Sequence, residues 1–244
     1  MRRKLLTVWY ALLILFCLEL VTYGAVGFMA DYYHKLIWER FNAGIKEYRE
    51  VNSSLPYADF INRASRAEGI SGQVVAAVIQ AESSFQPRAL SRSGAYGLMQ
   101  VIPSTWRQVN NQIKACTGRH AGDCTSDCYF NPEINITIGT AYLGQLYKSY
   151  NGDMVRALAA YNAGPGEVSR YGGVPPFQET NEYIDRIITY WFKAQNKPLP
   201  SYSLQSEYWQ DVRSTLGWLC LLTAVLIGFV LWRLLKRHHS WRWR

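Results

Sequence analysis

A long apolar stretch lies near each end of the chain, and these two stretches constrain the fold more than any other feature. Residues 5–30 contain one charged residue, Glu19, and residues 214–232 contain none. A helix needs about 20 residues to cross the hydrocarbon core of a bilayer, and both stretches have that length. Trp218 and Trp232, near the ends of the second stretch, are typical of residues that anchor a span at the membrane interface. The sequence therefore predicts two transmembrane helices.

The N-terminal stretch has a second interpretation, a cleaved signal peptide. Its apolar region is longer than that of a typical signal peptide, and its best small-x-small cleavage site is Ala25-Val26-Gly27. Cys17 follows Phe16 rather than a small residue, which disfavours a lipoprotein site. We therefore expect an uncleaved anchor, with the signal peptide as the alternative. Glu19 is costly in lipid, and we expect it to pair with a neighbouring helix; a partner contact or a proton path is the alternative.

The basic charge of the chain is concentrated at its two ends. Residues 1–29 have a net charge of +2 and residues 215–244 have +5, which leaves +1 for the residues between, out of a total of +8. A nearly neutral central part disfavours nucleic-acid binding. Basic residues beside a span tend to stay in the cytoplasm. Both termini are therefore predicted to be cytoplasmic, with residues 31–213 on the other side of the membrane.

The segments between the spans differ in character. Tyr33, Ile37, Phe41 and Ile45 recur every four residues, which predicts an amphipathic helix after the first span. Residues 196–214 are typical of a tether. We divide the chain into an N-terminal transmembrane anchor (1–30), an amphipathic linker helix (31–54), a compact domain (55–197), a tether (198–213), a second transmembrane helix (214–235) and a basic cytoplasmic tail (236–244).

The compact domain is predicted to be all-α. No alternating strand pattern stands out, and apolar residues recur at helical spacing in five segments. Ser71 is predicted to cap the second of these helices, and Gly164-Pro165 to stop the fourth. The predicted helices are Tyr57–Glu68, a helix from Ser71 with Val74, Val75, Val78 and Ile79 on one face, Pro132–Tyr150, Met154–Asn162 and a helix from Thr180.

Three of the five cysteines, Cys116, Cys124 and Cys128, lie in the extracytoplasmic part. In an oxidising compartment two of them are expected to pair, and a bond from Cys116 to Cys124 or to Cys128 is plausible. With His120 the spacing is Cys-x3-His-x3-Cys-x3-Cys, which is not a recognised zinc pattern, so no metal is predicted.

Among the acidic residues, Glu82 is the best candidate for a catalytic group. It stands at the C-terminal end of an apolar helix, where the helix dipole and apolar neighbours both raise the pKa of a carboxyl group. A glutamic acid that stays protonated near neutral pH can act as a general acid. The alternative from these residues alone is a solvated glutamate at a helix end.

Four sequence blocks surround Glu82 in a fixed order: ESSFQPRALSRSGAYGLMQVIPST at 82–105, NPEINITIGTAYL at 131–143, ALAAYNAGPGEV at 157–168 and PPFQETNEYI at 175–184. Together they resemble the catalytic domain of the soluble lytic transglycosylase family, which has a lysozyme-like, goose-type α-helical fold. The resemblance covers nearly all of residues 55–197. With the two apolar stretches, the predicted fold is a lysozyme-like all-α catalytic domain flanked by two transmembrane helices.

The resemblance also implies roles for individual residues. Glu82 matches the sole catalytic acid/base of the family, and Ile102 stands where some relatives have methionine. The residues that match substrate-binding positions are Ser83, Ser91, Gln100, Tyr161, Asn162 and Glu179.

The implied reaction is cleavage of the β-1,4 bond between N-acetylmuramic acid and N-acetylglucosamine in peptidoglycan, with 1,6-anhydro ends and no cofactor. A hydrolytic muramidase and an inactive peptidoglycan-binding scaffold are the alternatives.

The predicted partners are peptidoglycan strands and the membrane. The location implied is the bacterial inner membrane, crossed twice, with the catalytic domain in the periplasm. Double anchoring leads to the hypothesis that the chain serves an envelope-spanning secretion or conjugation apparatus.

Overall fold

The computed structural model describes residues 2–116, 126–199 and 201–239. In these residues the regular structure is helical, as predicted, apart from two isolated bridges that join Leu90 to Tyr96 and Tyr96 to Val101. The chain forms two compact units. The first comprises residues 1–37 and 200–244, and the second comprises residues 38–199.

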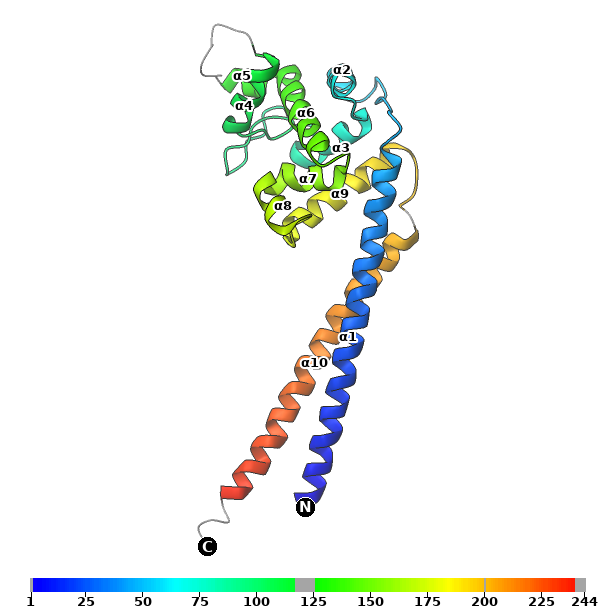
Figure 1. Cartoon of the computed structure of the whole chain (residues 1–244), viewed down its shortest axis with the longest axis vertical. Coiled ribbons are helices and arrows are strands. Elements are labelled where there is room, and N and C mark those ends of the chain that lie inside the picture. The colour runs from blue at the N-terminus through cyan, green and yellow to red at the C-terminus, as the bar shows by residue number, and fades with distance from the viewer. Residues whose placement is uncertain (1, 117–125, 200, 240–244) are drawn as a thin grey trace. The chain divides into compact units, whose positions relative to one another are not determined.

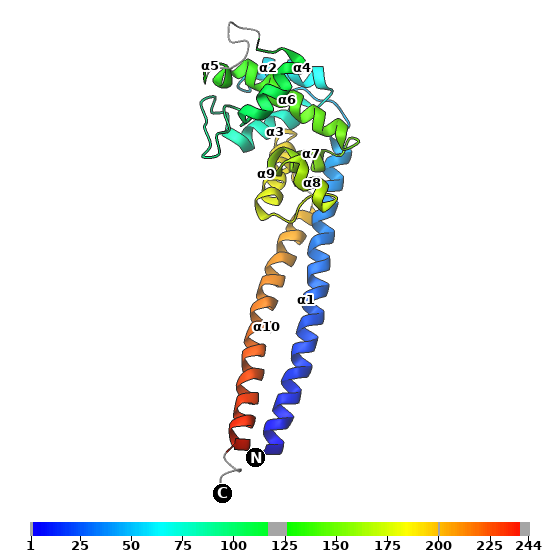
Figure 2. The ribbon, with the colours of Figure 1, turned by 60° about the vertical axis from the view of Figure 1, so that its left-hand side comes forward.

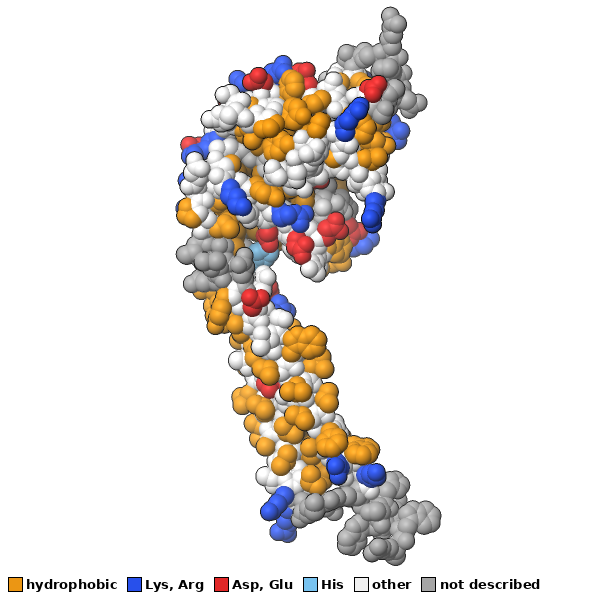
Figure 3. Space-filling model, turned by 180° about the vertical axis from the view of Figure 1, so that it is seen from behind, with side chains coloured by type: hydrophobic (Ala, Val, Ile, Leu, Met, Phe, Trp, Pro, Cys, Tyr) orange, Lys and Arg blue, Asp and Glu red, His pale blue; other side chains and the backbone are white. Residues whose placement is uncertain are grey.

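The first unit is built from two long helices, α1 (Arg2–Gly44) and α10 (Ser201–His239), which run side by side. The start of α1 and the end of α10 lie at the same end of the unit (Figures 1 and 2). The segments Arg3–Gly44 and Tyr208–Lys236 are long and apolar enough to cross a membrane. Exposed hydrophobic side chains cover the visible face of this helix pair (Figure 3). These are the two apolar helices that the sequence predicts.

Two contacts set the register of the helix pair. The guanidinium of Arg213 lies over the ring of Tyr23, with its carbon 5.3 Å from the ring centroid. The hydroxyl of Thr223 donates a hydrogen bond of 3.0 Å to Oε1 of Glu19. Glu19 therefore pairs with the neighbouring helix, which was the expectation for a carboxyl group in a span.

The segments predicted as linker and tether are largely helical. Helix α1 continues without a break through residues 31–44, so the predicted amphipathic linker is the end of the first helix and not a separate one. Helix α10 starts at Ser201, and most of the predicted tether, residues 198–213, is therefore its first part. The physical reason is local, since residues 201–213 contain neither proline nor glycine and favour a helix.

The second unit packs the last turns of α1 with eight shorter helices. Phe41 of α1 is fully buried and meets Trp191 edge-on, with ring centroids 5.2 Å apart. Asn42 binds Asp153 through a hydrogen bond of 2.9 Å. The other helices are α2 (Ala58–Glu68), α3 (Gly72–Ser83), α4 (Pro103–Ile113), α5 (Ser126–Phe130), α6 (Pro132–Ser149), α7 (Met154–Ala163), α8 (Pro165–Tyr171) and α9 (Gln178–Ala194).

The five predicted helices correspond to α2, α3, α6, α7 and α9, whereas α4, α5 and α8 were not predicted. One predicted cap is wrong in detail. Ser71 does precede α3, but its hydroxyl makes no capping hydrogen bond. It donates instead to the carbonyl oxygen of Arg49, 3.1 Å away, because the chain after α1 folds back onto this buried serine.

Candidate active site

Glu82 lies in the last turn of α3, and α9 supplies its partner. The phenol of Tyr183, which is buried, donates a hydrogen bond of 2.6 Å to Oε1 of Glu82. Helix α3 ends at Ser83, one residue after Glu82, and Ser84 and Phe85 then adopt left-handed backbone conformations with φ of 51° and 62°. This sharp turn ends the helix and places Glu82 at its tip.

Burial raises the pKa of Glu82 from 4.5 to about 7. The residue keeps some exposed surface, but protein atoms surround its carboxyl group and disfavour the charged form. The hydrogen bond from Tyr183 and the positive charge of Arg186 act in the opposite direction and lower the pKa. Near neutral pH the site therefore holds both the protonated and the ionised form of Glu82.

Two tyrosines next to Glu82 remain protonated. Burial raises the pKa of Tyr183 and of Tyr161 well above the ordinary value of 10, and the negative charge of Glu82 raises both further. The hydroxyl of Tyr161 donates a hydrogen bond of 2.8 Å to the carbonyl oxygen of Met99. Tyr161 therefore connects α7 to the loop that precedes α4.

This loop, residues 89–101, carries two of the predicted binding residues. Gln100 has a φ of 47°, and its Nε2 donates to the carbonyl oxygens of Ala89 at 3.1 Å and Gly97 at 2.8 Å. The Ser91 hydroxyl accepts a hydrogen bond of 2.9 Å from the amide of Ala95. Both side chains thus hold the shape of the loop itself.

Ser83 and Asn162 also bind the protein. The hydroxyl of Ser83 lies 2.8 Å from the carbonyl oxygen of Leu98 and 3.1 Å from that of Ile79, so it ties α3 to the same loop. Oδ1 of Asn162 accepts a hydrogen bond of 2.8 Å from Thr180, which joins the end of α7 to the start of α9. These two predicted residues therefore bond to the protein and hold the elements around the site together.

Glu179 is exposed in the first turn of α9, four residues before Tyr183. Within the described residues it makes no hydrogen bond or ion pair with Glu82. The structure therefore brings Tyr161 close to Glu82, whereas Ser91 and Glu179 have no direct contact with it.

Two important residues were not in the predicted set. Tyr183 contacts Glu82 from 101 residues away. Asn135 is fully buried in α6, where its Oδ1 accepts from the amide of Met99 at 2.8 Å and its Nδ2 donates to the carbonyl oxygens of Tyr96 and Tyr129, both at 2.9 Å. The sequence signal that could have identified Asn135 is its amide side chain one turn before Ile138, on the inward face of a predicted helix.

Asn135 also explains a glycine. Gly97 has a φ of 74°, and a Cβ placed there would lie 2.4 Å from Nδ2 of Asn135. Gly97 is therefore needed both for its backbone conformation and for the close approach of the loop to α6.

Two of the three cysteines among which a pair is expected lie close together. The sulfur atoms of Cys116 and Cys128 are 3.2 Å apart. The side chain of Asn110 holds the backbone of Cys116 in place, since Oδ1 accepts from its amide at 2.8 Å. Cys124 and His120 lie outside the described residues, and in the part that is described no group of three acidic, histidine or cysteine side chains forms a candidate metal site.

Comparisons with known proteins give the same assignment for the second unit. A model of the family described as transglycosylase SLT domain matches residues 59–184. Soluble lytic murein transglycosylase of Salmonella typhimurium is 32% identical over 157 residues, which are 59% of this chain and 24% of that protein. Membrane-bound lytic murein transglycosylase C of Photorhabdus laumondii is 40% identical over 121 residues, covering 47% of this chain and 33% of that protein.

Solved structures of lytic transglycosylases have a similar fold. An inactive mutant of the lytic transglycosylase Slt from Pseudomonas aeruginosa matches with a TM-score of 0.52 and 28% identity, over 60% of this chain and 25% of that one. A complex of the 70-kDa soluble lytic transglycosylase with bulgecin A matches with a TM-score of 0.53 and 28% identity, over 60% and 26%.

The chain spans about a quarter to a third of the length of these curated relatives. The fold of the matched residues is the lysozyme-like helical fold that the sequence predicts. Because the family model covers more than half of the chain, the chain belongs to the family of proteins with a transglycosylase SLT domain.

Proposed function

We propose that this chain is a lytic transglycosylase, anchored in a bacterial membrane, that cleaves the β-1,4 bond between N-acetylmuramic acid and N-acetylglucosamine in peptidoglycan. The observation that carries the proposal is the desolvated carboxyl group of Glu82, with a pKa of about 7, inside a domain of this family. A carboxyl group with that pKa can donate a proton and then accept one at neutral pH.

In the proposed reaction, protonated Glu82 gives its proton to the glycosidic oxygen as the bond from that oxygen to C1 of the muramic sugar breaks. The Glu82 carboxylate then takes the proton of the C6 hydroxyl while the C6 oxygen bonds to C1. The products are a free C4 hydroxyl and a 1,6-anhydro end. Water is not consumed, because the nucleophile belongs to the sugar itself and is already positioned.

The charge that acts on Glu82 fits this reaction. Most glycosidases that use water have a second carboxylate across the bond. Such a carboxylate near Glu82 would raise its pKa through like charge, yet among the described residues the charge that acts on Glu82 is that of Arg186, which lowers the pKa. Glu179 therefore fits a role in holding saccharide, together with Ser91, better than a role as a second catalytic group.

Mass spectrometry of peptidoglycan digested by the full chain in detergent tests this function. Anhydro-muramic ends from the wild type support a transglycosylase. Reducing ends would mean a muramidase, and an absence of products with intact binding to the sacculus would mean a scaffold.

Tyr183→Phe removes the hydrogen bond that lowers the pKa of Glu82, and its pH profile reports on the role of that bond. The pKa of Glu82 should rise above its present value of about 7. Because activity requires protonated Glu82, the loss of activity at high pH should move to higher pH in the variant. Initial rates measured across the pH range would show this shift. A lower rate whose fall at high pH occurs at the same pH as in the wild type would mean that Tyr183 only supports the fold.

We further propose that α1 and α10 form a two-pass membrane anchor with both termini in the cytoplasm. Basic residues cluster at one end of the helix pair (Figure 3). In the sequence, Asp31 follows the first apolar stretch, and Asp211 and Arg213 precede the second. Between them the carboxyl group of Glu19 is bonded to Thr223. Reporter fusions at both termini that show a periplasmic location would contradict this topology.

The role in an envelope-spanning secretion or conjugation apparatus stays a proposal that rests on the double anchor. Affinity purification of the full chain from detergent-solubilised membranes should recover components of such a machine. Recovery of the chain alone would count against it.

We also propose a disulfide bond between Cys116 and Cys128. Its formation releases two protons and passes two electrons to a disulfide-bearing oxidoreductase of the periplasm. Only a small rotation is needed, because the two sulfur atoms already lie 3.2 Å apart. Closing a loop of this length should contribute about 3 kcal/mol to the free energy of unfolding.

Peptide mapping after alkylation of the protein purified from membranes tests the pair. A Cys116–Cys128 crosslinked peptide is expected, with Cys17, Cys124 and Cys220 alkylated. Alkylation of Cys128 in the unreduced protein would contradict the bond. Cys220→Ser, in the predicted second span, is the control and should leave the crosslinked peptide unchanged.

A further inference from the structure

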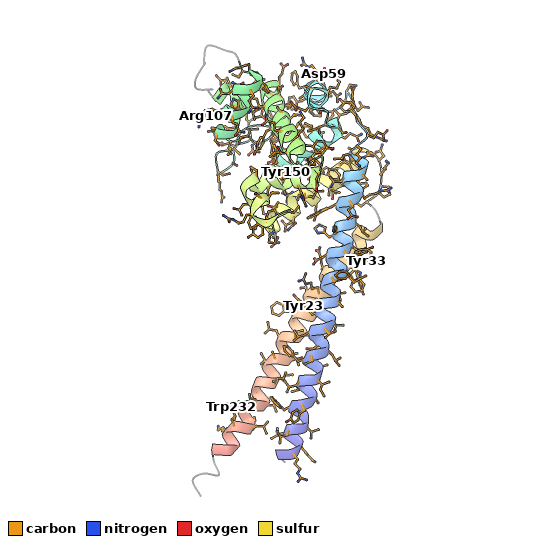
Figure 4. All side chains as sticks on the ribbon, viewed as in Figure 1. Tyr23, Tyr33, Asp59, Arg107, Tyr150 and Trp232 are labelled. Atoms are coloured by element: carbon orange, nitrogen blue, oxygen red, sulfur yellow. The ribbon has the colours of Figure 1, made fainter. Side chains whose placement is uncertain are left out.

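Two aromatic side chains are exposed at the turn between α8 and α9. Tyr171, the last residue of α8, is 48% exposed, and Phe177, which directly precedes α9, is 37% exposed. Their ring centroids are 5.6 Å apart, and the rings meet edge-on at 82°. Side chains of α8 and of the start of α9 project from the side of the second unit that lies away from Asp59 and Arg107 (Figure 4). The two rings, which we call the aromatic pair, therefore form one apolar surface that is open to solvent.

The turn holds the aromatic pair in place before any ligand binds. Gly172, with a φ of 66°, ends α8 directly after Tyr171. Pro175 and Pro176 have a fixed φ and stiffen the segment that leads to α9. Nδ2 of Asn181 donates a hydrogen bond of 3.0 Å to the carbonyl oxygen of Phe177. Because the rings are already ordered, a ligand that packs on them loses little conformational entropy.

Helix α9 connects the aromatic pair to Glu82. Tyr183 of this helix donates a hydrogen bond to Glu82, and Glu179 precedes Tyr183 by one turn on the same face of the helix. Phe177 stands six residues before Tyr183, which is about 9 Å along the helix axis. The order along this end of α9 is therefore the aromatic pair, then Glu179, then the residue that contacts Glu82.

Glu179 has acceptor oxygens to spare, whereas two neighbouring carboxyl groups are occupied. Oε1 of Glu182 accepts a hydrogen bond of 2.8 Å from Gln178. Oε1 of Glu167 forms an ion pair of 3.1 Å with Arg170. Glu179 has no such partner among the residues that the structure describes. An exposed carboxylate that is free to accept hydrogen bonds thus lies two residues from Phe177.

We propose that Tyr171, Phe177 and Glu179 bind a sugar of the peptidoglycan strand beyond the bond that Glu82 cleaves, and that this contact gives the enzyme a preference for long strands. The inference rests on the proposed function and adds a binding position to it. Neither of the two aromatic residues has a role in the proposed reaction or in the resemblance.

The chemistry of a β-1,4-linked sugar matches this surface. Its hydroxyl groups project from the edge of the ring, and its two faces expose C–H bonds. The face of an aromatic ring carries partial negative charge and attracts such C–H bonds. A carboxylate accepts strong hydrogen bonds from hydroxyl groups at the edge. The stem peptide fits less well, because its own carboxyl groups would be repelled by Glu179.

Binding of glycan strands to the full chain in detergent, measured by calorimetry, tests the surface. Every protein in the series carries Glu82→Gln, so that no strand is cleaved. The ligands are a peptide-free disaccharide and a peptide-free octasaccharide of the glycan repeat. The octasaccharide should bind more tightly than the disaccharide. Tyr171→Ala and Phe177→Ala should each lower this preference about three- to tenfold, the size expected for the loss of one aromatic contact.

Three further variants show whether the ring itself matters. Tyr171→Phe keeps the ring and should keep most of the preference for the long strand. Tyr171→Leu keeps an apolar side chain without a flat face and should behave like Tyr171→Ala. Tyr48→Ala is the matched control, since Tyr48 is 40% exposed in the same unit but has Glu50 and Arg66 as its charged neighbours. It should leave the affinities for both strands unchanged.

The outcomes separate this inference from the proposed function. A preference for long strands that falls in Tyr171→Ala, Tyr171→Leu and Phe177→Ala but not in Tyr48→Ala supports the surface. Strand binding that none of these variants changes would overturn the inference and leave the proposed function intact. A loss seen only with strands that carry stem peptides would assign the surface to the peptide and contradict the proposal. An absence of binding to strands of either length would count against the proposed function and the inference together.

Discussion

Glu82→Gln should lower the rate of anhydro-muramic product formation by at least about a thousandfold. The glutamine keeps the shape of the side chain but can neither donate nor accept the proton, and a single general acid–base group contributes roughly 10² to 10⁴ in rate. Because Glu82 serves both steps of the proposed reaction, the loss should lie in the upper part of this range. Release of anhydro ends from purified peptidoglycan, measured by mass spectrometry, checks it.

The same variant should be more stable than the wild type at alkaline pH. The pKa of Glu82 is raised in the folded protein to about 7 from 4.5, so its contribution is fully favourable below pH 4.5 and is lost as the pH rises through about 7. The loss amounts to about 3 kcal/mol, and Glu82→Gln does not suffer it. The melting temperature of the variant relative to the wild type should therefore rise by about 6 to 12 °C between about pH 4 and about pH 8.

A control variant makes these results specific. Glu179→Gln removes an exposed carboxyl group and should leave the pH dependence of the melting temperature unchanged. An active Glu82→Gln enzyme would contradict the catalytic assignment. A pH-independent difference in melting temperature would contradict the buried state of the carboxyl group.

Asn135→Leu should lower the free energy of unfolding by roughly 3 to 6 kcal/mol and remove most of the activity. The substitution leaves the amide of Met99 and the carbonyl group of Tyr96 in the loop, and the carbonyl group of Tyr129 in α5, without these hydrogen bonds. Each such loss costs about 1 to 3 kcal/mol. Because these bonds hold the loop that carries Gln100 and contacts Ser83 and Tyr161, the surroundings of Glu82 should become disordered as well.

Denaturant unfolding in detergent with two companion variants tests this prediction. Asn135→Asp keeps the acceptor for Met99 and loses the two donor bonds, so its stability should fall between those of the wild type and Asn135→Leu. Asn131→Ala lies in the same segment and removes only the cap of α6, an effect of about 1 kcal/mol. Equal stabilities of Asn135→Leu and Asn131→Ala would show that the asparagine does not hold the loop.

Sequence patterns identify helices best where the apolar spacing is regular and a stop signal is present. Helices α3 and α7 fall close to their predicted bounds because apolar faces and Gly164 mark them. Helix α4 has the weaker signal of Trp106 and Val109 behind a proline, and it was missed. Helix α5 has five residues, too few to show a period.

The candidate site shows the same division between local and long-range information. Glu82 is recognisable from its place at a helix end and from the blocks around it. Its hydrogen bond to Tyr183, and the burial that raises its pKa to about 7, depend on α9 packing against α3. Gln100 and Ser83 bind the backbone of the loop, which their residue types alone do not reveal.

Local patterning along this chain is thus sufficient for two apolar helices and an all-α domain, and the resemblance of four sequence blocks adds the family and the residue that carries the proposed chemistry. These features depend on the composition and spacing of neighbouring residues. The protonation behaviour of Glu82 and the support of its loop by Asn135 depend on residues that are far apart in sequence. Desolvation and hydrogen bonding act through distance in space, so only the folded chain decides them.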